Sequence, residues 1–440
     1  MKLKILSFAC IICLLCCMIC CLGACGIQQT TGIVDAEIND QGELILTYQN
    51  GTQQNLGVVV GKDGHDGADG TNGTLVIDGS NGSIAAASAK GLRSAVSIVC
   101  NFQATVQQGG WRPGSGSTTT KNYSSAGSGV IYRLDKDQGD AFIITNYHVV
   151  YDASSNTENG ISQDISVYLY GCVTEDDAIP ATYVGGSIYY DIAVLRIEDS
   201  ELLRDSFACP IEIADSDAVA AGDSAIAIGN AQGYGISVSS GIVSVDSEYI
   251  TMTAADGRTE LSFRVIRVDT AVNSGNSGGG LYDDQGNLIG IVNAKMVDDG
   301  VENIGYAIPS NVAISIADNI IDYCYGTDME RVQRALIGIT VSATDSKATY
   351  DSETGRISIQ EQVFVYEVSK GSLADGNLQA GDVLLSVTLK GETTSLTRQH
   401  QLIDRMLDVR PGDTVELCVL RDGQTHTVTL TITQDCLTAY

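Results

Sequence analysis

The chain has 440 residues and a formal net charge of −29, and it is long enough for two or three domains that each bury a core of their own. Such an acidic chain repels phosphate groups, which excludes nucleic acid as an electrostatic partner. The 48 glycines exceed the usual share of ~7% and are typical of a fold with many turns and short strands.

Segment 1–25 has the pattern of a secretory signal peptide, with Lys2 and Lys4 before an apolar run and small residues at its end. The stretch Leu-Gly-Ala-Cys that closes it resembles a bacterial lipobox, which implies that Cys25 is lipidated and becomes the first residue of the mature chain. The alternative is an uncleaved transmembrane anchor, because the apolar run is about long enough to span a bilayer. Both interpretations place the rest of the chain outside the cell membrane.

Two short segments follow. Residues 26–60 contain two apolar stretches and an Asn50-Gly51 pair typical of a hairpin turn, so we predict a small β unit. Residues 61–88 begin with glycine at every third position from Gly61 to Gly73. This period is collagen-like, but it is short and lacks proline, so we predict a flexible spacer.

Residues 89–325 repeat short apolar stretches between turn signals, among them GSGVIY, AFIITNYHVV, DIAVLRI, SAIAIGN, FRVIRVD and NLIGIVNA. This spacing predicts an all-β sandwich or barrel, closed by a helix near 311–323 with Ser310 as its N-cap. Residues 326–440 carry further strands and one helix near 397–407, which indicates a small α+β module. The six cysteines after the signal peptide form no C-x-x-C pair, so we expect free, buried thiols and no metal site.

Ser277 lies among glycines in the stretch VNSGNSGGGL, and a serine hydroxyl needs a base to become a nucleophile. Within the β domain His148 is the only histidine, at the end of an apolar strand. Asp191 directly precedes another apolar strand and is the carboxylate expected to orient that imidazole. The order His148, Asp191, Ser277 in an all-β pattern is that of the chymotrypsin arrangement.

A rival interpretation is the G-x-S-x-G elbow of α/β-hydrolases, which residues 275–279 also satisfy. In that fold a helix follows the serine and the histidine comes last, whereas here strands follow the serine and the later histidines lie in another module. We therefore reject the elbow. The backbone N–H groups of Gly275 and Ser277 are expected to form an oxyanion hole, and Gly278 and Gly279 are expected to let the chain pass close to the substrate.

With these residues in place, the sequence resembles the HtrA (Deg) family of serine proteases, in which a trypsin-like protease domain precedes PDZ domains. The matching stretches are IITNYHVV, DIAVLRI, GDSAIAIGN, SGIVSV, DTAVNSGNSGGGL and NIGYAIPSN, in family order. The resemblance implies a mainly β protein, with a chymotrypsin-like double β-barrel followed by a small α+β PDZ domain. It also implies the triad His148, Asp191 and Ser277, no cofactor, and assembly into homotrimers.

The resemblance extends to specificity and peptide binding. Ala271 falls where trypsin-like enzymes build the base of the primary specificity pocket, and the lack of an acid there favours small or medium aliphatic side chains over arginine or lysine. RALIGI and the strands after it look like an HtrA-type PDZ domain. Its carboxylate-binding loop would be Leu336, Ile337, Gly338 and Ile339, with Gly338 giving the carboxylate of a C-terminal peptide room.

The expected function is that of a serine endopeptidase anchored to the outer face of a bacterial cell membrane as a lipoprotein. Its partners would be misfolded or exposed polypeptides, C-terminal peptides at the PDZ domain, and the membrane through its lipid. The alternative, from another class, is a membrane-tethered peptide-binding scaffold or holdase whose protease domain is idle. Labelling of Ser277 by a serine-directed fluorophosphonate separates the two.

Overall fold

A computed structural model describes residues 33–39, 41, 43–58, 83–108, 117–157, 159–294, 304–326, 332–353 and 355–439. The chain divides into two compact units, residues 1–76 and 77–440. The predicted signal peptide, with Cys25, lies outside the described residues, as does most of the predicted spacer. Among the described residues, no helix has the length and apolar character that a membrane crossing requires.

The first unit holds a three-stranded antiparallel sheet in the order β1-β2-β3. Its strands are β1 (Ile33–Ile38), β2 (Glu43–Tyr48) and β3 (Gln53–Val58). The turn between β2 and β3 contains Asn50 and Gly51, and Gly51 has a φ of +80°, a conformation that glycine adopts without steric cost. The Asn50 side chain accepts a hydrogen bond from the backbone N–H of Thr52 at 3.0 Å, which fixes the turn.

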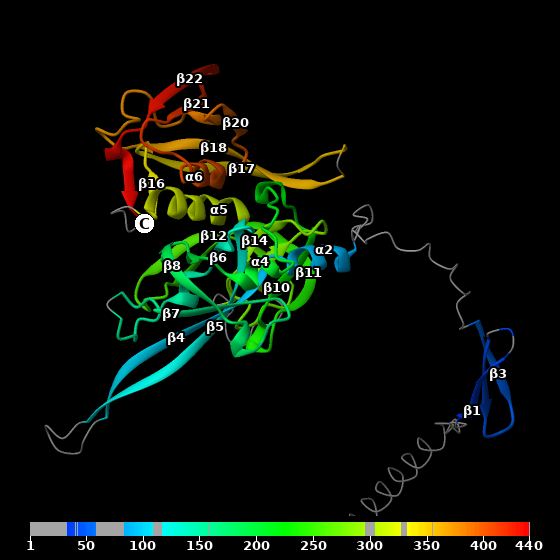
Figure 1. Cartoon of the computed structure of the whole chain (residues 1–440). Coiled ribbons are helices and arrows are strands. Elements are labelled where there is room, and N and C mark those ends of the chain that lie inside the picture. The colour runs from blue at the N-terminus through cyan, green and yellow to red at the C-terminus, as the bar shows by residue number, and fades with distance from the viewer. Residues whose placement is uncertain are drawn as a thin grey trace, which may run out of the picture. The chain divides into compact units, whose positions relative to one another are not determined.

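The second unit contains two closed antiparallel barrels, visible in Figure 1. The first has the strand order β4-β5-β6-β9-β8-β7, formed by β4 (Ala95–Gln108), β5 (Ser117–Asp135), β6 (Asp140–Thr145), β7 (Asp164–Leu169), β8 (Ile179–Ser187) and β9 (Ile192–Ile197). The second has the order β10-β11-β12-β15-β14-β13, formed by β10 (Ser224–Gly229), β11 (Ser237–Thr253), β12 (Glu260–Val268), β13 (Gly280–Tyr282), β14 (Leu288–Val292) and β15 (Gly305–Pro309). The predicted mainly β double-barrel fold is confirmed.

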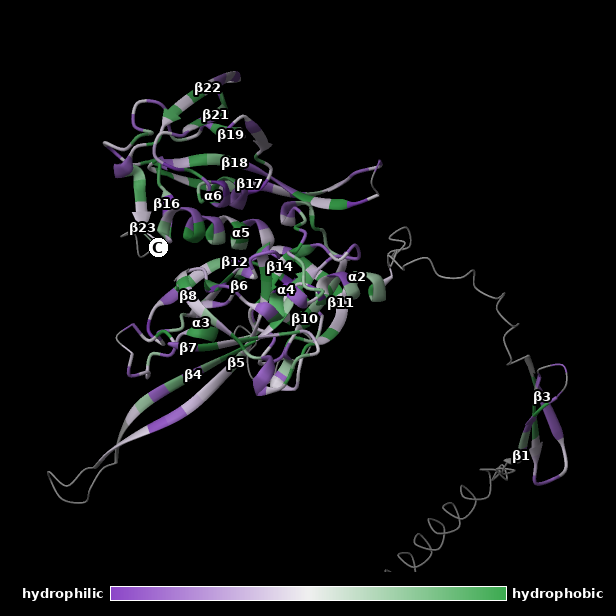
Figure 2. Ribbon diagram, viewed as in Figure 1, coloured by the Kyte–Doolittle hydropathy of each residue, from purple (hydrophilic) through white to green (hydrophobic). Residues whose placement is uncertain are grey.

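Apolar side chains close each barrel around a core of its own. Ile98, Ile143 and Leu195 are fully buried in the first barrel, and Ile266 and Leu281 are fully buried in the second. All five residues of β14 are buried, and Figure 2 colours this strand hydrophobic. Burial of such side chains contributes roughly 1.5–3 kcal/mol each, so the barrels form a rigid frame for the loops at their ends.

The β4–β5 hairpin is longer than the sequence indicated. The two strands pair continuously from Ala95 opposite Val130 to Gln108 opposite Ser117. Figure 1 shows them leaving the first barrel as a two-stranded ribbon, and Figure 2 shows that much of its outer part is hydrophilic. Period-2 apolar patterning fades where a strand leaves the core, which is why the sequence prediction recovered only GSGVIY here.

The predicted boundary between spacer and β domain, at residues 88 and 89, falls inside a helix. Helix α2 spans Ile84–Leu92, and Ser83 caps it by accepting a hydrogen bond from the Ala86 N–H. The helix packs on the second barrel, where a Cβ atom on Gly91 would lie 2.7 Å from the Ile228 side chain. Residues 84–88 therefore belong to the folded unit, because their alanines form a helix that buries one face.

Helix α5 (Ser310–Asn319) and a π-helical turn, η5 (Ile320–Cys324), occupy the region predicted as the closing helix. The N-cap is Pro309 rather than Ser310. The Ser310 hydroxyl instead donates to the carbonyl of Ala214 at 2.8 Å. Shorter elements of this unit include α3 (Tyr147–Val150), α4 (Glu201–Asp205) and the 3-10 turn η3 (Ala231–Gly233).

The C-terminal part is a small α+β domain with a sheet in the order β17-β18-β19-β21-β22. Its elements are β16 (Gln333–Ala335), β17 (Ile339–Tyr350), β18 (Ile357–Val368), β19 (Val383–Leu389), β20 (Glu392–Ser395), α6 (Gln399–Arg405), β21 (Thr414–Arg421), β22 (Gln424–Thr431) and β23 (Leu437–Ala439). β20 pairs with β19, and β16 pairs with β23. β17 is an edge strand of the sheet, so one side of it is open to a further strand.

Ion pairs join this domain to the second barrel. The Arg264 guanidinium, buried in β12, lies 2.9 Å from a carboxylate oxygen of Asp217 and 2.8 Å from one of Asp404, which belongs to α6. His400 is also buried, with its Nε2 3.5 Å from Asp217. His400 is buried because the second barrel covers its face of α6, where Ser247 Oγ lies 3.4 Å from Nδ1.

Candidate active site

His148 is held by the short helix α3 that follows β6. Asn146 precedes this helix and is completely buried, and its side-chain amide donates to the backbone carbonyl of Asp191 at 2.9 Å. The backbone N–H of Tyr147 donates to the same carbonyl at 3.2 Å. These two hydrogen bonds hold the residues that follow β6 next to Asp191, whose carboxylate faces the His148 imidazole.

Asp191 accepts hydrogen bonds from both the backbone and the ring of His148. Its Oδ1 accepts from the His148 N–H at 2.9 Å, and its Oδ2 lies 2.7 Å from Nδ1. Because a carboxylate only accepts, Nδ1 carries the proton and Nε2 is left as the basic nitrogen. Asp191 is 4% exposed and has a φ of +51°, a region in which aspartate is one of the tolerated residues. This backbone conformation turns the carboxylate towards His148 rather than into the strand β9.

Asn293 is a site residue that the sequence interpretation missed. It directly follows β14, is fully buried, and donates from Nδ2 to Asp191 Oδ2 at 2.6 Å. The Asp191 carboxylate thus accepts hydrogen bonds from three groups, which fixes both of its oxygens. A buried asparagine at a strand end is a common structural feature, so the sequence carried no signal that singled this one out.

Ser277 lies on the loop between β12 and β13 of the second barrel and is 5% exposed. Its carbonyl accepts from the Ser128 N–H at 2.8 Å, and its Oγ accepts from the Ala294 N–H at 3.2 Å. In the described residues no hydrogen bond joins Ser277 Oγ to His148. Two consecutive residues nevertheless contact both parts of the site. The Ala294 N–H donates to the Ser277 hydroxyl, and Asn293, the residue before it, donates to the Asp191 carboxylate.

Gly275 forms a tight turn just before the nucleophile. The Asn276 N–H donates to the Asn273 carbonyl at 3.0 Å, and Gly275, third in this turn, has a φ of +94°, as a type II turn requires. The Ser274 carbonyl accepts from the Gln232 N–H of η3 at 2.7 Å and so points away from the nucleophile. Within the described chain the N–H groups of Gly275 and Ser277 have no hydrogen-bond partner, which leaves both free for an oxyanion.

The adjacent glycines permit close packing around the nucleophile loop. A Cβ atom on Gly278, which has a φ of +85°, would meet Ser128, Thr145 and Asn146 of the first barrel. A Cβ atom on Gly279 would meet the carbonyls of Ile228 and Asn276 within the second barrel. Gly278 therefore lets the two barrels approach each other, and Gly279 lets the loop pack on β10.

Ala271 is exposed, and its carbonyl accepts a hydrogen bond from the Ser239 hydroxyl at 2.9 Å. Its side chain is a methyl group, which supplies no charge to pair with a basic substrate side chain. Residues 295–303, which follow the site in sequence, lie outside the described residues.

The predicted carboxylate loop joins β16 to β17. The Leu336 N–H donates to the Cys436 carbonyl at 2.7 Å, so it is not available to a ligand. Gly338 has a φ of +85°, and a Cβ atom there would collide with the Ser372 side chain. Glycine is thus required at residue 338 by the fold of the loop, whether or not a carboxylate binds beside it. Within the described chain, the N–H groups of Ile337 and Gly338 donate no hydrogen bond to another backbone carbonyl.

Comparison with known proteins identifies both domains. Residues 127–291 match the trypsin-like peptidase domain family, and residues 335–432 match the PDZ domain family. The serine protease Do-like HtrA of Lactococcus lactis subsp. cremoris is 32% identical over 92% of this chain and 94% of its own length. Do-like HtrA of Bacillus subtilis is 31% identical over 78% of this chain and 71% of its own length.

A third relative is the periplasmic pH-dependent serine endoprotease DegQ of Escherichia coli, 33% identical over 70% of this chain and 60% of its own length. The identity and coverage of the first relative establish the family, and the resemblance noted in the sequence is confirmed. The predicted fold of a protease double barrel followed by a small PDZ domain is confirmed as well. The chain belongs to the HtrA family of trypsin-like serine endopeptidases that carry a PDZ domain.

Proposed function

We propose that this endopeptidase cleaves misfolded or exposed polypeptides with the triad His148, Asp191 and Ser277. The observation that carries the proposal is the arrangement around the nucleophile. Asp191 fixes the proton of His148 on Nδ1, while the N–H groups of Gly275 and Ser277 are free on the described loop. This combination of base and oxyanion donors is what acyl transfer requires.

In this mechanism Ser277 Oγ attacks the carbonyl carbon of the scissile bond, and His148 Nε2 takes the hydroxyl proton. The attack requires Oγ to exchange its contact with the Ala294 N–H for a hydrogen bond to Nε2. The amides of residues 275 and 277 bind the oxyanion. The C–N bond then breaks as His148 passes its proton to the leaving amine, and water hydrolyses the acyl-enzyme by the same steps.

A fluorophosphonate probe tests the triad. We expect it to label the full chain, and labelling should be lost in Ser277→Ala. It should fall strongly in His148→Ala, which keeps the hydroxyl but removes the base. An idle scaffold or holdase would bind peptides without being labelled, and it is not favoured, because the family is one of active endopeptidases.

The specificity pocket is proposed to take small or medium aliphatic side chains, because Ala271 offers a methyl group where a basic substrate would need an acid. Digestion of an unfolded protein followed by mass spectrometry checks this. Cleavage mainly after arginine or lysine would contradict it.

The PDZ domain is proposed to bind C-terminal peptides by adding them as a strand to the open edge of β17. Ile337, Gly338 and Ile339 would hold the terminal carboxylate, and Leu336 would line the loop without donating its N–H. Amidation of the peptide's C-terminus should therefore abolish binding. Equal affinity for the acid and the amide would refute the carboxylate loop.

We further propose that a lipid on Cys25 anchors the chain to the outer face of the cell membrane and that the protein forms homotrimers. Intact-mass measurement of membrane-extracted protein distinguishes a chain that begins at a diacylated Cys25 from an uncleaved anchor. Cys25→Ala should remain unlipidated. Light scattering of the extracted protein gives the number of subunits, and a monomeric mass would exclude the trimer.

A further inference from the structure

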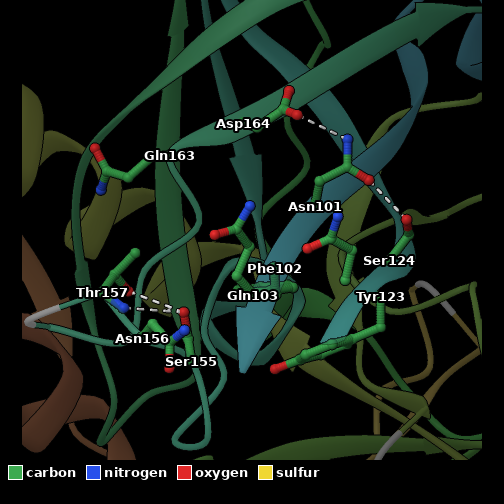
Figure 3. Close-up of a pocket in the computed structure, with 11 residues that line it drawn as sticks. Asn101, Phe102, Gln103, Tyr123, Ser124, Ser155, Asn156, Thr157, Gln163 and Asp164 are labelled. Carbon is green, nitrogen blue, oxygen red and sulfur yellow. Dashed lines mark hydrogen bonds between the residues drawn. The ribbon is translucent and has the colours of Figure 1, made fainter. Parts of the chain in front are cut away.

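We propose that a pocket at the base of the β4–β5 ribbon binds an uncharged saccharide. The pocket has a volume of about 660 Å³ and is lined by β4, β5 and residues 155–157 and 163–164 (Figure 3). This volume lies within the range of about 300–1,000 Å³ that is typical of small-molecule sites. It shares no lining residue with the proposed triad.

The chemistry of the lining selects the ligand. Five of the lining side chains are carboxamides, from Asn101, Gln103, Asn122, Asn156 and Gln163. No lysine or arginine lines the pocket, so phosphate or carboxylate ligands would find no countercharge. A carboxamide has both a hydrogen-bond donor and an acceptor, and each sugar hydroxyl also donates and accepts. One carboxamide can therefore form hydrogen bonds with two neighbouring hydroxyl groups of a sugar.

Strand register places these groups on one face. Asn101 of β4 lies opposite Ser124 of β5, and Gln103 lies opposite Asn122. Because alternate residues of a strand share a face, all four side chains project to the same side of the ribbon. Asp164 of β7 joins them, since it pairs with Asn101 on the other edge of β4.

Part of the pocket is held in place before any ligand arrives. The Asn101 Oδ1 accepts from the Ser124 hydroxyl at 2.6 Å, and its Nδ2 donates to Asp164 at 2.9 Å, as Figure 3 shows. The Asn156 N–H donates to the Gln103 carbonyl at 2.7 Å, and Asn156 Oδ1 accepts from the Thr105 N–H at 2.9 Å. Fixed polar groups lower the entropic cost of binding.

Two carboxamides remain open to a ligand. Neither the Gln103 nor the Asn122 side chain forms a hydrogen bond with another residue of the described chain. Phe102 and Tyr123 pair with each other at the alternate position of the register, so their rings stack with centroids 5.6 Å apart on the other face of the ribbon. The open carboxamides suit a ligand whose edges carry hydroxyl groups, because each hydroxyl both donates and accepts.

The pocket is suited to binding rather than hydrolysis. Glycoside cleavage ordinarily uses a pair of carboxylates, whereas Asp164 is the only carboxylate among the lining residues. A peptide is a poorer match than a sugar, since peptide recognition draws its specificity from apolar side-chain pockets, which this polar lining does not provide. The pocket would thus hold the enzyme on a neutral glycan without acting on it.

Isothermal titration calorimetry on the full chain tests the proposal, with Ser277→Ala included to prevent self-digestion and a detergent that lacks a sugar head group. The probes are chitotetraose, cellotetraose and maltotetraose. At least one should bind, and the double substitution Gln103→Ala with Asn122→Ala should weaken it at least tenfold, since it removes two hydrogen-bonding groups. Gln379→Ala, an exposed glutamine of the PDZ domain, is the matched control and should leave binding unchanged.

The proposal is overturned if none of the three saccharides binds, or if the double variant binds as tightly as the control. It is also overturned if the double variant loses affinity for an unfolded polypeptide instead, because the pocket would then serve substrate. In the background that retains Ser277, the double variant should cleave a short peptide at the wild-type rate. Failure of saccharide binding is therefore distinguishable from failure of the proposed triad.

Discussion

Replacing Asn293 with alanine should slow the enzyme while leaving the triad itself intact. The substitution removes the 2.6 Å hydrogen bond from Asn293 Nδ2 to Asp191 Oδ2. A hydrogen bond to a charged group contributes about 1.5–3 kcal/mol, and Asp191 is buried, so water cannot readily replace the lost donor. If this stabilisation acts on the imidazolium-carboxylate pair of the transition state, kcat/KM falls about 10- to 150-fold.

The assay is steady-state cleavage of a short peptide with an aliphatic residue before the scissile bond, compared with Ser277→Ala as the baseline. Asn287→Ala is the matched control, because Asn287 also donates to an aspartate, Asp283, at 3.2 Å in the same barrel but away from the site. It should keep wild-type kcat/KM. Thermal unfolding separates a loss of folded protein from a loss of catalysis. Full activity in a folded Asn293→Ala enzyme would refute the reasoning that Asp191 depends on this donor.

Three further predictions concern the oxyanion turn, a buried ion cluster and a buried thiol. Gly275→Ala should lower kcat about 10²–10³-fold, because a side chain at φ +94° meets the Asn230 carbonyl and displaces an oxyanion donor. Gly222→Ala is the control, because Gly222 has the same φ but open space where the Cβ atom would lie. Equal kcat values for the two variants would contradict the role of Gly275 in the oxyanion hole. Burial alone would raise the pKa of Asp217, but His400 and Arg264 outweigh it and lower the pKa to about 2, from an ordinary 3.8. The ionised Asp217 therefore stabilises the folded protein above about pH 4, and this stabilisation is lost as the pH falls through 2. The free energies of unfolding of wild type and Asp217→Asn should accordingly converge at low pH. A difference between them that stays constant with pH would contradict this prediction. Burial, and then the charge of Asp164, raises the pKa of the Cys100 thiol to about 12. Iodoacetamide at pH 8 should therefore leave Cys100 unmodified in the native protein while it alkylates the half-buried Cys436. Peptide mass spectrometry measures the modification of each thiol. Equal modification of the two thiols would be inconsistent with a closed first barrel.

The cysteines illustrate how far local patterns reach. Without a C-x-x-C pair the sequence predicted free, buried thiols, and none of the six cysteines of the described chain forms a disulfide. The prediction of burial is wrong for four of them, because only Cys100 and Cys324 are buried while the others are partly exposed. Burial depends on which face of a strand meets the core, and local sequence patterns do not determine that.

The sequence by itself determined the class of fold and the chemical candidates. Alternating apolar stretches separated by turn residues require many short strands, and strands of this number form a sandwich or a barrel. Residue types were also decisive, because one histidine in the β domain and one serine set among glycines left few candidates for a base and a nucleophile. Such features depend on neighbours along the chain, which is why they could be read without coordinates.

Only the tertiary structure decided which side chains support the site. Asn293 and Ser128 contact Asp191 and the nucleophile loop from strands that are distant in sequence, and nothing in their local sequence marks them. The same holds for His400, whose burial arises from packing between two domains. Hydrogen bonds and burial of this kind are set by how the barrels close and meet, so they follow from long-range packing rather than from local propensity.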